Sequence, residues 1–192
     1  MKTLVAILLL VLAVPAQADL LLGARVGQQQ LGIKESLNGV VVSDTSLTTK
    51  SALSLVVGAG MPGAEGGRLS AEFASYTFGD GALDVFALGY QHLLPALNTH
   101  PLYRLRPFVG GDAGYGRLVR DAQPLFGRSD DKGLNAGPRG GLNLTVGERA
   151  EVELGLRYTW LGLTAEQQGA GGTAVTEIRD NRAWWIGFNI GM

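Results

Sequence analysis

Residues 151–161 read EVELGLRYTWL, and this stretch decides the fold class. Its even-numbered positions, from Val152 to Trp160, are all apolar or aromatic, whereas its odd-numbered positions include Glu151, Glu153 and Arg157. Successive side chains of a β-strand point to opposite faces, so this period of two indicates a strand with one apolar and one polar face.

The same period recurs along the rest of the chain, most clearly at 51–61 and 184–192. Eight segments show it: 20–31, 49–61, 68–78, 83–93, 106–117, 133–146, 150–162 and 179–192. Each is close to the roughly 9 to 11 residues with which a tilted strand crosses a bilayer. The sequence therefore predicts an all-β fold, an eight-stranded antiparallel up-and-down transmembrane β-barrel.

The links between these segments alternate in length. Residues 62–67 and 147–149 make short turns, whereas 32–48, 118–132 and 163–178 are long and polar and are expected to be loops. If the termini lie on one side, most long links fall on the other, which is the asymmetry of bacterial outer-membrane barrels. The links 79–82 and 94–105 depart from this rule.

The composition of the polar faces favours a membrane barrel over a soluble one. These faces carry Gly, Ser, Asn and Thr in place of the dense Lys and Glu of a solvated surface, so they are predicted to line the lumen. Six aromatic residues are expected near the outer strand ends, as an interfacial girdle: Tyr76, Phe78, Tyr115, Tyr158, Trp160 and Trp184. A soluble periplasmic barrel that binds a hydrophobic ligand stays open as an alternative.

Charged residues of the predicted lumen faces form a balanced set of five cations and five anions. They are Arg25, Lys50, Arg68, Arg139 and Arg157, against Glu72, Asp84, Asp112, Glu151 and Glu153. The interior of an eight-stranded barrel is just wide enough to be filled by side chains, and buried charges persist when they are paired. We therefore expect a plugged lumen held by ion pairs; a narrow gated channel is the functional alternative.

The N-terminal segment has the features of a secretory signal peptide. Lys2 is followed by the apolar residues 4–14 and by the small-x-small motif Ala16-Gln17-Ala18. The predicted organisation is a signal peptide at 1–18 and a barrel domain at 19–192.

Composition excludes several other classes of protein. With 16 Lys+Arg against 17 Asp+Glu and no cysteine, the chain is neither a basic nucleic-acid binder nor a disulfide scaffold, zinc finger or thiol enzyme. The motif at 58–63 matches G-x-G-x-x-G but ends a strand and contains Pro62, so no cofactor is expected. His92 and His100 are interpreted as histidines without a catalytic role, and a lipid-modifying barrel enzyme is the weaker alternative.

The chain resembles a known family in its signal peptide, its eight alternating segments, the stretch RPFVGGDAGYG at 106–116 and its aromatic last strand. It looks like the small outer-membrane β-barrel proteins typified by the OmpA barrel domain and OmpX. The resemblance implies a monomer in the outer membrane of a Gram-negative bacterium, assembled by the barrel assembly machinery and in contact with outer-membrane lipid and lipopolysaccharide. The implied role is non-enzymatic, in envelope integrity or surface interaction.

Two residues depart from the family pattern. Met192 stands where the family usually ends in Phe or Trp, and Pro138 removes a hydrogen-bond donor from the sixth predicted strand. A bulge at Pro138, or a later start of that strand, is expected.

Overall fold

The structure is a computed structural model that describes residues 20–49, 52–61, 66–79, 81–98, 100 and 102–192. The predicted signal peptide and Lys50 lie outside these residues. Nine strands are described: β1 (Leu20–Leu37), β2 (Val40–Thr48), β3 (Ala52–Gly60), β4 (Gly67–Phe78), β5 (Gly81–Leu93), β6 (Tyr103–Arg120), β7 (Ser129–Val146), β8 (Ala150–Gly169) and β9 (Gly172–Gly191).

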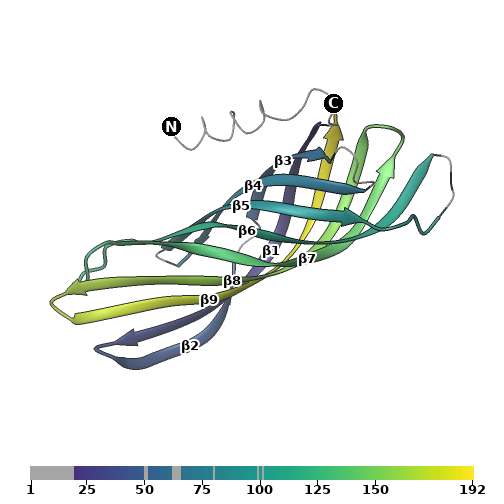
Figure 1. Cartoon of the computed structure of the whole chain (residues 1–192). Coiled ribbons are helices and arrows are strands. Elements are labelled where there is room, and N and C mark those ends of the chain that lie inside the picture. Colours follow the sequence, from purple (N-terminus) through teal and green to yellow (C-terminus); the bar gives the residue numbers. More distant parts are fainter. Residues whose placement is uncertain (1–19, 50–51, 62–65, 80, 99, 101) are drawn as a thin grey trace.

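These strands form one antiparallel sheet that closes on itself (Figure 1). Closure comes from the pairing of β1 with β9, which runs from Leu21↔Gly191 to Leu37↔Ala174. On its other edge β1 pairs with β3 through Leu20–Gly27 and with β2 through Gln30–Leu37. Strands β2 and β3 thus occupy one position, so the nine segments make a ring of eight, and the predicted fold is confirmed.

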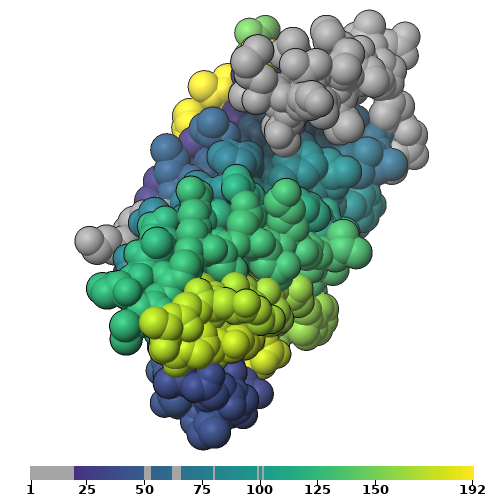
Figure 2. All heavy atoms as spheres, turned by 90° about the vertical axis from the view of Figure 1, so that its left-hand side faces the viewer, coloured from purple at the N-terminus to yellow at the C-terminus, as the bar shows by residue number. Residues whose placement is uncertain are grey.

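The prediction of long loops at 32–48, 118–132 and 163–178 is wrong, because the strands extend through most of these segments. The segment 32–48 is largely the hairpin of β1 and β2, which turns at Asn38 and Gly39, both with positive φ. Likewise β8 and β9 continue to a turn at Gly169–Gly172, and β6 and β7 end at Arg120 and Ser129. These three hairpins lie at the end of the barrel opposite to Leu20 and Met192, and Figure 2 faces them.

The outward face of each long strand changes from apolar to polar along its length. On β8 the outward residues Val152, Leu154, Leu156 and Trp160 are followed by Thr164, Glu166 and Gln168. Val152 to Trp160 spans eight steps of about 3.4 Å, which at a tilt of about 40° gives ~21 Å, close to the apolar band of roughly 25 Å in outer-membrane barrels. We call the part inside this band the membrane half and the rest the outer half.

The inward-facing residues change in the opposite direction, from polar in the membrane half to apolar in the outer half. In the membrane half the interior is polar and charged, whereas in the outer half it is filled by one apolar cluster, here called the outer core. Its members are Leu31, Ile33, Ala74, Tyr76, Phe78, Leu83, Val85, Ala87, Leu118, Leu161, Leu163, Ala165 and Ile178, with Leu47 packed against them. The outer half is thus built like a water-soluble β-structure, with apolar residues inside and polar residues outside.

Pro138 lies within β7 and needs no bulge. It pairs in register with Gly111 on β6, while the ladder between β7 and β8 passes from Ala136↔Trp160 to Arg139↔Arg157 without a pair at Gly137 or Pro138. Because the same number of residues is skipped on each strand, the ladder resumes in register, and neither expected irregularity occurs.

Candidate functional site: the barrel lumen

The interior of the membrane half holds four arginines and four carboxylates, which we call the lumen network. The cations are Arg25 from β1, Arg68 from β4, Arg139 from β7 and Arg157 from β8, and the anions are Glu72 from β4, Asp112 from β6, and Glu151 and Glu153 from β8. Strand alternation brings them together, because each is on the inward face of its strand. These eight residues belong to the ten that the sequence assigned to the lumen.

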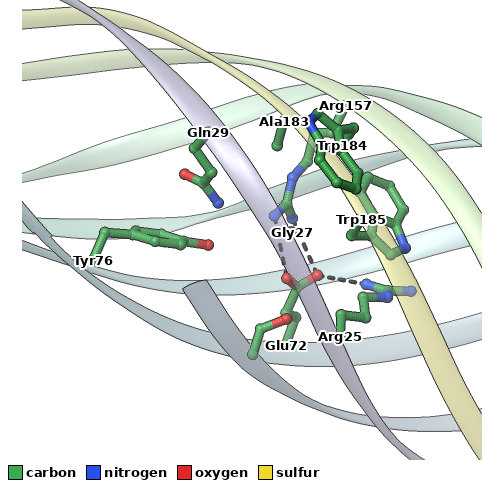
Figure 3. A pocket seen from close by; sticks show the side chains of 10 residues that line it. Arg25, Gly27, Gln29, Glu72, Tyr76, Arg157, Ala183, Trp184 and Trp185 are labelled. Carbon is green, nitrogen blue, oxygen red and sulfur yellow. Dashed lines mark hydrogen bonds and ion pairs between the residues drawn. The ribbon is translucent and has the colours of Figure 1, made fainter. Parts of the chain in front are cut away.

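Glu72 is the centre of the network. Its carboxylate accepts a hydrogen bond of 2.6 Å from Arg25 Nη1 and two of 3.1 Å from Arg157 Nη1 and Nη2. Figure 3 shows both guanidinium groups directed at this carboxylate, with Trp185 beside them. Side chains from β1, β4 and β8 are thereby tied across the barrel.

Asp112 and Glu153 complete the charge balance around this centre. Asp112 lies 2.9 Å from Arg139 Nη1 and 3.6 Å from Arg157 Nη1. Glu153 lies 2.8 Å from Arg25 Nη2 and accepts a hydrogen bond of 2.7 Å from the indole Nε1 of Trp185. Three arginines therefore face three carboxylates, each of them almost completely buried.

A separate ion pair, between Arg68 and Glu151, lies at the end of the network nearest to Met192. Both terminal nitrogens of Arg68 donate to Glu151, each at 2.6 Å, and Asn143 Nδ2 donates to the same carboxylate at 3.1 Å. Below this pair a cavity of about 370 Å³ is bordered by Leu21, Glu148, Arg149 and Met192. Arg68 and Glu151 also line this cavity.

Pairing decides whether so many charges are tolerated inside the barrel. Removing a charge from water costs several kcal/mol, which is offset only where an opposite charge and further hydrogen bonds are in place. Trp185 adds to this, since the guanidinium carbons of Arg25 and Arg157 lie 5.0 and 5.6 Å from its ring centre. A cavity of about 20 Å³ remains beside Arg25, Glu72 and Arg157, room for one water molecule.

Towards the outer half the polar interior ends in a neutral contact. Asn181 Nδ2 donates a hydrogen bond of 2.7 Å to Gln29 Oε1, and both residues are buried. Beyond them begins the outer core, where Leu31, Leu83, Leu118 and Leu163 are fully buried. The lumen thus contains an ionic layer followed by an apolar layer.

The assignment of Asp84 to the lumen is wrong. Asp84 lies on the outer surface of β5, where it accepts a hydrogen bond of 2.7 Å from Ser75 Oγ. The inward neighbours on this strand are Leu83 and Val85, which belong to the outer core. The polar face of a strand lines the lumen only in the membrane half, and Asp84 lies in the outer half.

Two members of the predicted aromatic girdle also lie elsewhere. Tyr76 and Phe78 are 3% and 5% exposed and form part of the outer core, because they share the inward face of β4 with Glu72. The structure places Tyr115, Trp160 and Trp184 on the outer surface, with 45%, 57% and 44% exposure. Tyr158 faces outward as well and meets the Trp160 ring edge-on at 5.2 Å between ring centres.

Sequence reasoning missed several lumen residues. Trp185 and the neutral residues Gln91 and Asn143 all contact the network, the last two through Glu153 and Glu151. Only their position in the alternating pattern indicates that they face the lumen. Trp185, for example, alternates with the lipid-facing Trp184 and Ile186.

The described residues contain no group of three or more His, Asp or Glu side chains that could hold a metal ion. His100 accepts a hydrogen bond from the backbone of Leu102 and stacks on Tyr103 at 4.1 Å between ring centres. No helix within the described part is long and apolar enough to cross a membrane.

Known structures of outer-membrane barrels share this fold. The chain is similar to the outer membrane protein OprG from Pseudomonas aeruginosa (TM-score 0.59, 14% identity, covering 91% of this chain and 96% of that one). It is also similar to Neisserial surface protein A (0.55, 13%, 88% and 96%) and to the N-terminal β-barrel domain of P. aeruginosa OprF (0.50, 14%, 90% and 99%). The sequence itself matches no protein-family model and no curated protein. The fold is that of the small eight-stranded outer-membrane β-barrels.

Proposed function

We propose that this protein is a non-enzymatic barrel of the Gram-negative outer membrane, with a closed lumen and a rigid outer half that serves in surface interaction or envelope integrity. The observation that supports the proposal is the pair of side-chain layers inside the barrel. The lumen network fills the membrane half, and the outer core fills the outer half.

Each layer opposes permeation for a different reason. An ion that passed the membrane half would have to separate Glu72 from Arg25 and Arg157, which leaves buried charges unpaired. The same ion would then enter an apolar cluster in which Leu83, Leu118 and Leu163 are fully buried, and these side chains cannot replace its hydration shell. Both layers would have to move before a continuous water path forms.

The outer half supports a role at the surface. Its hairpins extend well beyond the apolar band, and their polar outward faces carry ion pairs such as Arg117–Asp130 and Arg179–Asp44. Strand β2 pairs only with β1 among the described strands, and Val40, Val41 and Val42 near its tip are exposed. This gives the cell exterior a stiff β-structure with an accessible edge in place of flexible loops.

The proposal includes export and assembly by the general outer-membrane route. It takes 1–18 as a signal peptide, the barrel assembly machinery as the insertion partner, and a monomer as the working form. A soluble barrel is disfavoured, because the membrane half exposes Leu156, Ile186 and Phe188 at 66%, 54% and 51%. A lipid-modifying enzyme is disfavoured, because His92 lies on β5 with no carboxylate or serine partner among the described residues.

Planar-bilayer recording of the refolded protein tests the proposal. We expect no large, stable conductance steps, with a known porin in the same bilayers as the positive control. Insertion is verified separately by the shift in gel mobility between boiled and unboiled samples. Stable porin-sized steps from the inserted protein would refute the closed lumen.

A further inference from the structure

Arg182 occupies a distinctive place on the outer surface. On β9 it is the first outward residue after the apolar residues Phe188, Ile186 and Trp184, and it pairs with Tyr158, close to the outer limit of the apolar band at Trp160 of β8. Its side chain is 65% exposed. A cation thus stands where the apolar surface of the barrel gives way to the polar one.

The neighbouring strands surround Arg182 with aromatic and amide groups. Its guanidinium carbon lies 5.9 Å from the ring centre of Tyr158 on β8, which contacts Trp160 in turn. On the other side, Gln30 and Gln28 of β1 pair in register with Arg182 and Trp184. We call these residues, Gln28, Gln30, Tyr158, Trp160, Arg182 and Trp184, the Arg182 patch.

The charge of Arg182 is only weakly balanced within the chain. The carboxylate of Asp180 is 3.7 Å from Nε, and among the described residues the two terminal nitrogens have no hydrogen-bond or ion-pair partner. Arg117 makes a useful contrast, since it too is the outward residue that directly follows the last apolar one on its strand, here Tyr115 on β6. Its Nε and Nη2 both donate to Asp130, so its charge is already matched.

A phosphorylated lipid head group carries the negative charge that would balance Arg182. The planar guanidinium group binds phosphate oxygens through two parallel hydrogen bonds, and Tyr and Trp side chains prefer the boundary between acyl chains and head groups. The outer leaflet is favoured over the inner one, because Arg182 lies on the side of the apolar residues of β9 that faces the turn at Gly169–Gly172, away from Met192. We propose that the Arg182 patch binds a phosphate group of lipid A in the outer leaflet. This inference rests on the proposed outer-membrane orientation.

Native mass spectrometry of the refolded full barrel with added lipid A tests the inference. The samples are wild type, Arg182→Gln and the matched control Arg117→Gln, each with bisphosphorylated lipid A, dephosphorylated lipid A or phosphatidylglycerol. For wild type we expect clear retention of bisphosphorylated lipid A only. Arg182→Gln should lower that retention by about tenfold, the effect of losing charge-assisted hydrogen bonds, whereas Arg117→Gln should change it by less than about twofold.

Three results with lipid A would overturn the inference. They are equal retention by wild type and Arg182→Gln, equal losses for both arginine variants, and retention that does not depend on the lipid A phosphates. Equal retention of phosphatidylglycerol would also overturn the assignment to lipid A. Failure of the proposed function is recognised separately, because it appears as porin-sized conductance or as a barrel that does not fractionate with the outer membrane.

Discussion

Arg157 links two carboxylates of the lumen network, since it reaches both Glu72 and Asp112. Replacing it by Leu leaves two buried carboxylates with reduced compensation. We expect Arg157→Leu to lower the free energy of unfolding by about 3 to 5 kcal/mol, the usual cost of removing one partner of a buried pair. Denaturant titration of the barrel in detergent micelles or liposomes measures this.

The control for this variant is Arg117→Leu, which removes an arginine from an exposed pair on the outer surface. Exposed ion pairs contribute little to stability, so only a small change is expected. A harmless Arg157→Leu would contradict the assignment of this face to the lumen.

The pair of Arg117 and Asp130 predicts a pH effect in the outer half. Side-chain hydrogen bonds from Arg117 lower the pKa of Asp130 below its ordinary value of 3.8. Because the folded pKa is the lower one, the contribution of this carboxylate to stability is present above pH 3.8 and is lost as the pH falls through the folded pKa. Carboxyl-carbon NMR of the protein in micelles should show this low value, and Arg117→Gln should return it towards the ordinary one.

At the scale of single residues, eight of the predicted lumen charges lie inside the membrane half, whereas Lys50 lies outside the described residues. Arg25, Glu72 and Arg157 could be assigned because their strands alternate against lipid-facing leucines and valines. Asp84 could not, because its lumen assignment followed from polarity, and the polar face of a strand points outward in the outer half, where the surrounding medium is water. Tyr76 was misplaced for another reason: it shares the inward face of β4 with Glu72, so alternation alone places it inside.

The outward face of strand β8 meets lipid in the membrane half and water in the outer half, so one kind of substitution can test both environments. Leu156 faces outward in the middle of the apolar band, and Thr164 faces outward in the outer half. We expect Leu156→Arg to cost about 2 to 4 kcal/mol, as for a cation placed near the bilayer midplane of a barrel. Unfolding titrations in liposomes measure the cost.

Thr164→Arg is the matched variant on the same face of the same strand. Its side chain lies in water, so we expect a change within about 0.5 kcal/mol, as for ordinary surface positions. Equal costs at the two positions would show that the apolar band does not end between them.

At the scale of elements, the existence and order of the strands could be predicted, whereas their outer ends could not. The segment 163–178 is rich in Gly, Thr and Gln, which usually indicates a loop, yet β8 and β9 run through it to Gly169 and from Gly172. Long-range pairing overrides the local propensity there. Leu163, Ala165 and Ile178 supply the apolar alternation that packs into the outer core.

At the scale of the whole molecule, the reversal of polarity predicts how the protein behaves in solution. The membrane half exposes a continuous apolar surface that water does not tolerate, while the outer half needs no lipid. We expect the mature protein to fractionate with the outer membrane and to require detergent once extracted. Cell fractionation and gel filtration with and without detergent measure this, and a folded monomer in plain buffer would contradict it.

The three tryptophans also provide built-in optical probes of the two environments. Trp184 and Trp185 are neighbours in the chain but lie on opposite sides of the barrel wall, one 44% exposed and the other 4%. Brominated acyl chains should quench the emission of Trp160 and Trp184 on contact, whereas Trp185, shielded by the wall and bonded to Glu153, should stay bright. Fluorescence spectroscopy of single-tryptophan versions of this barrel can therefore separate the moment of membrane insertion from the moment at which the interior closes.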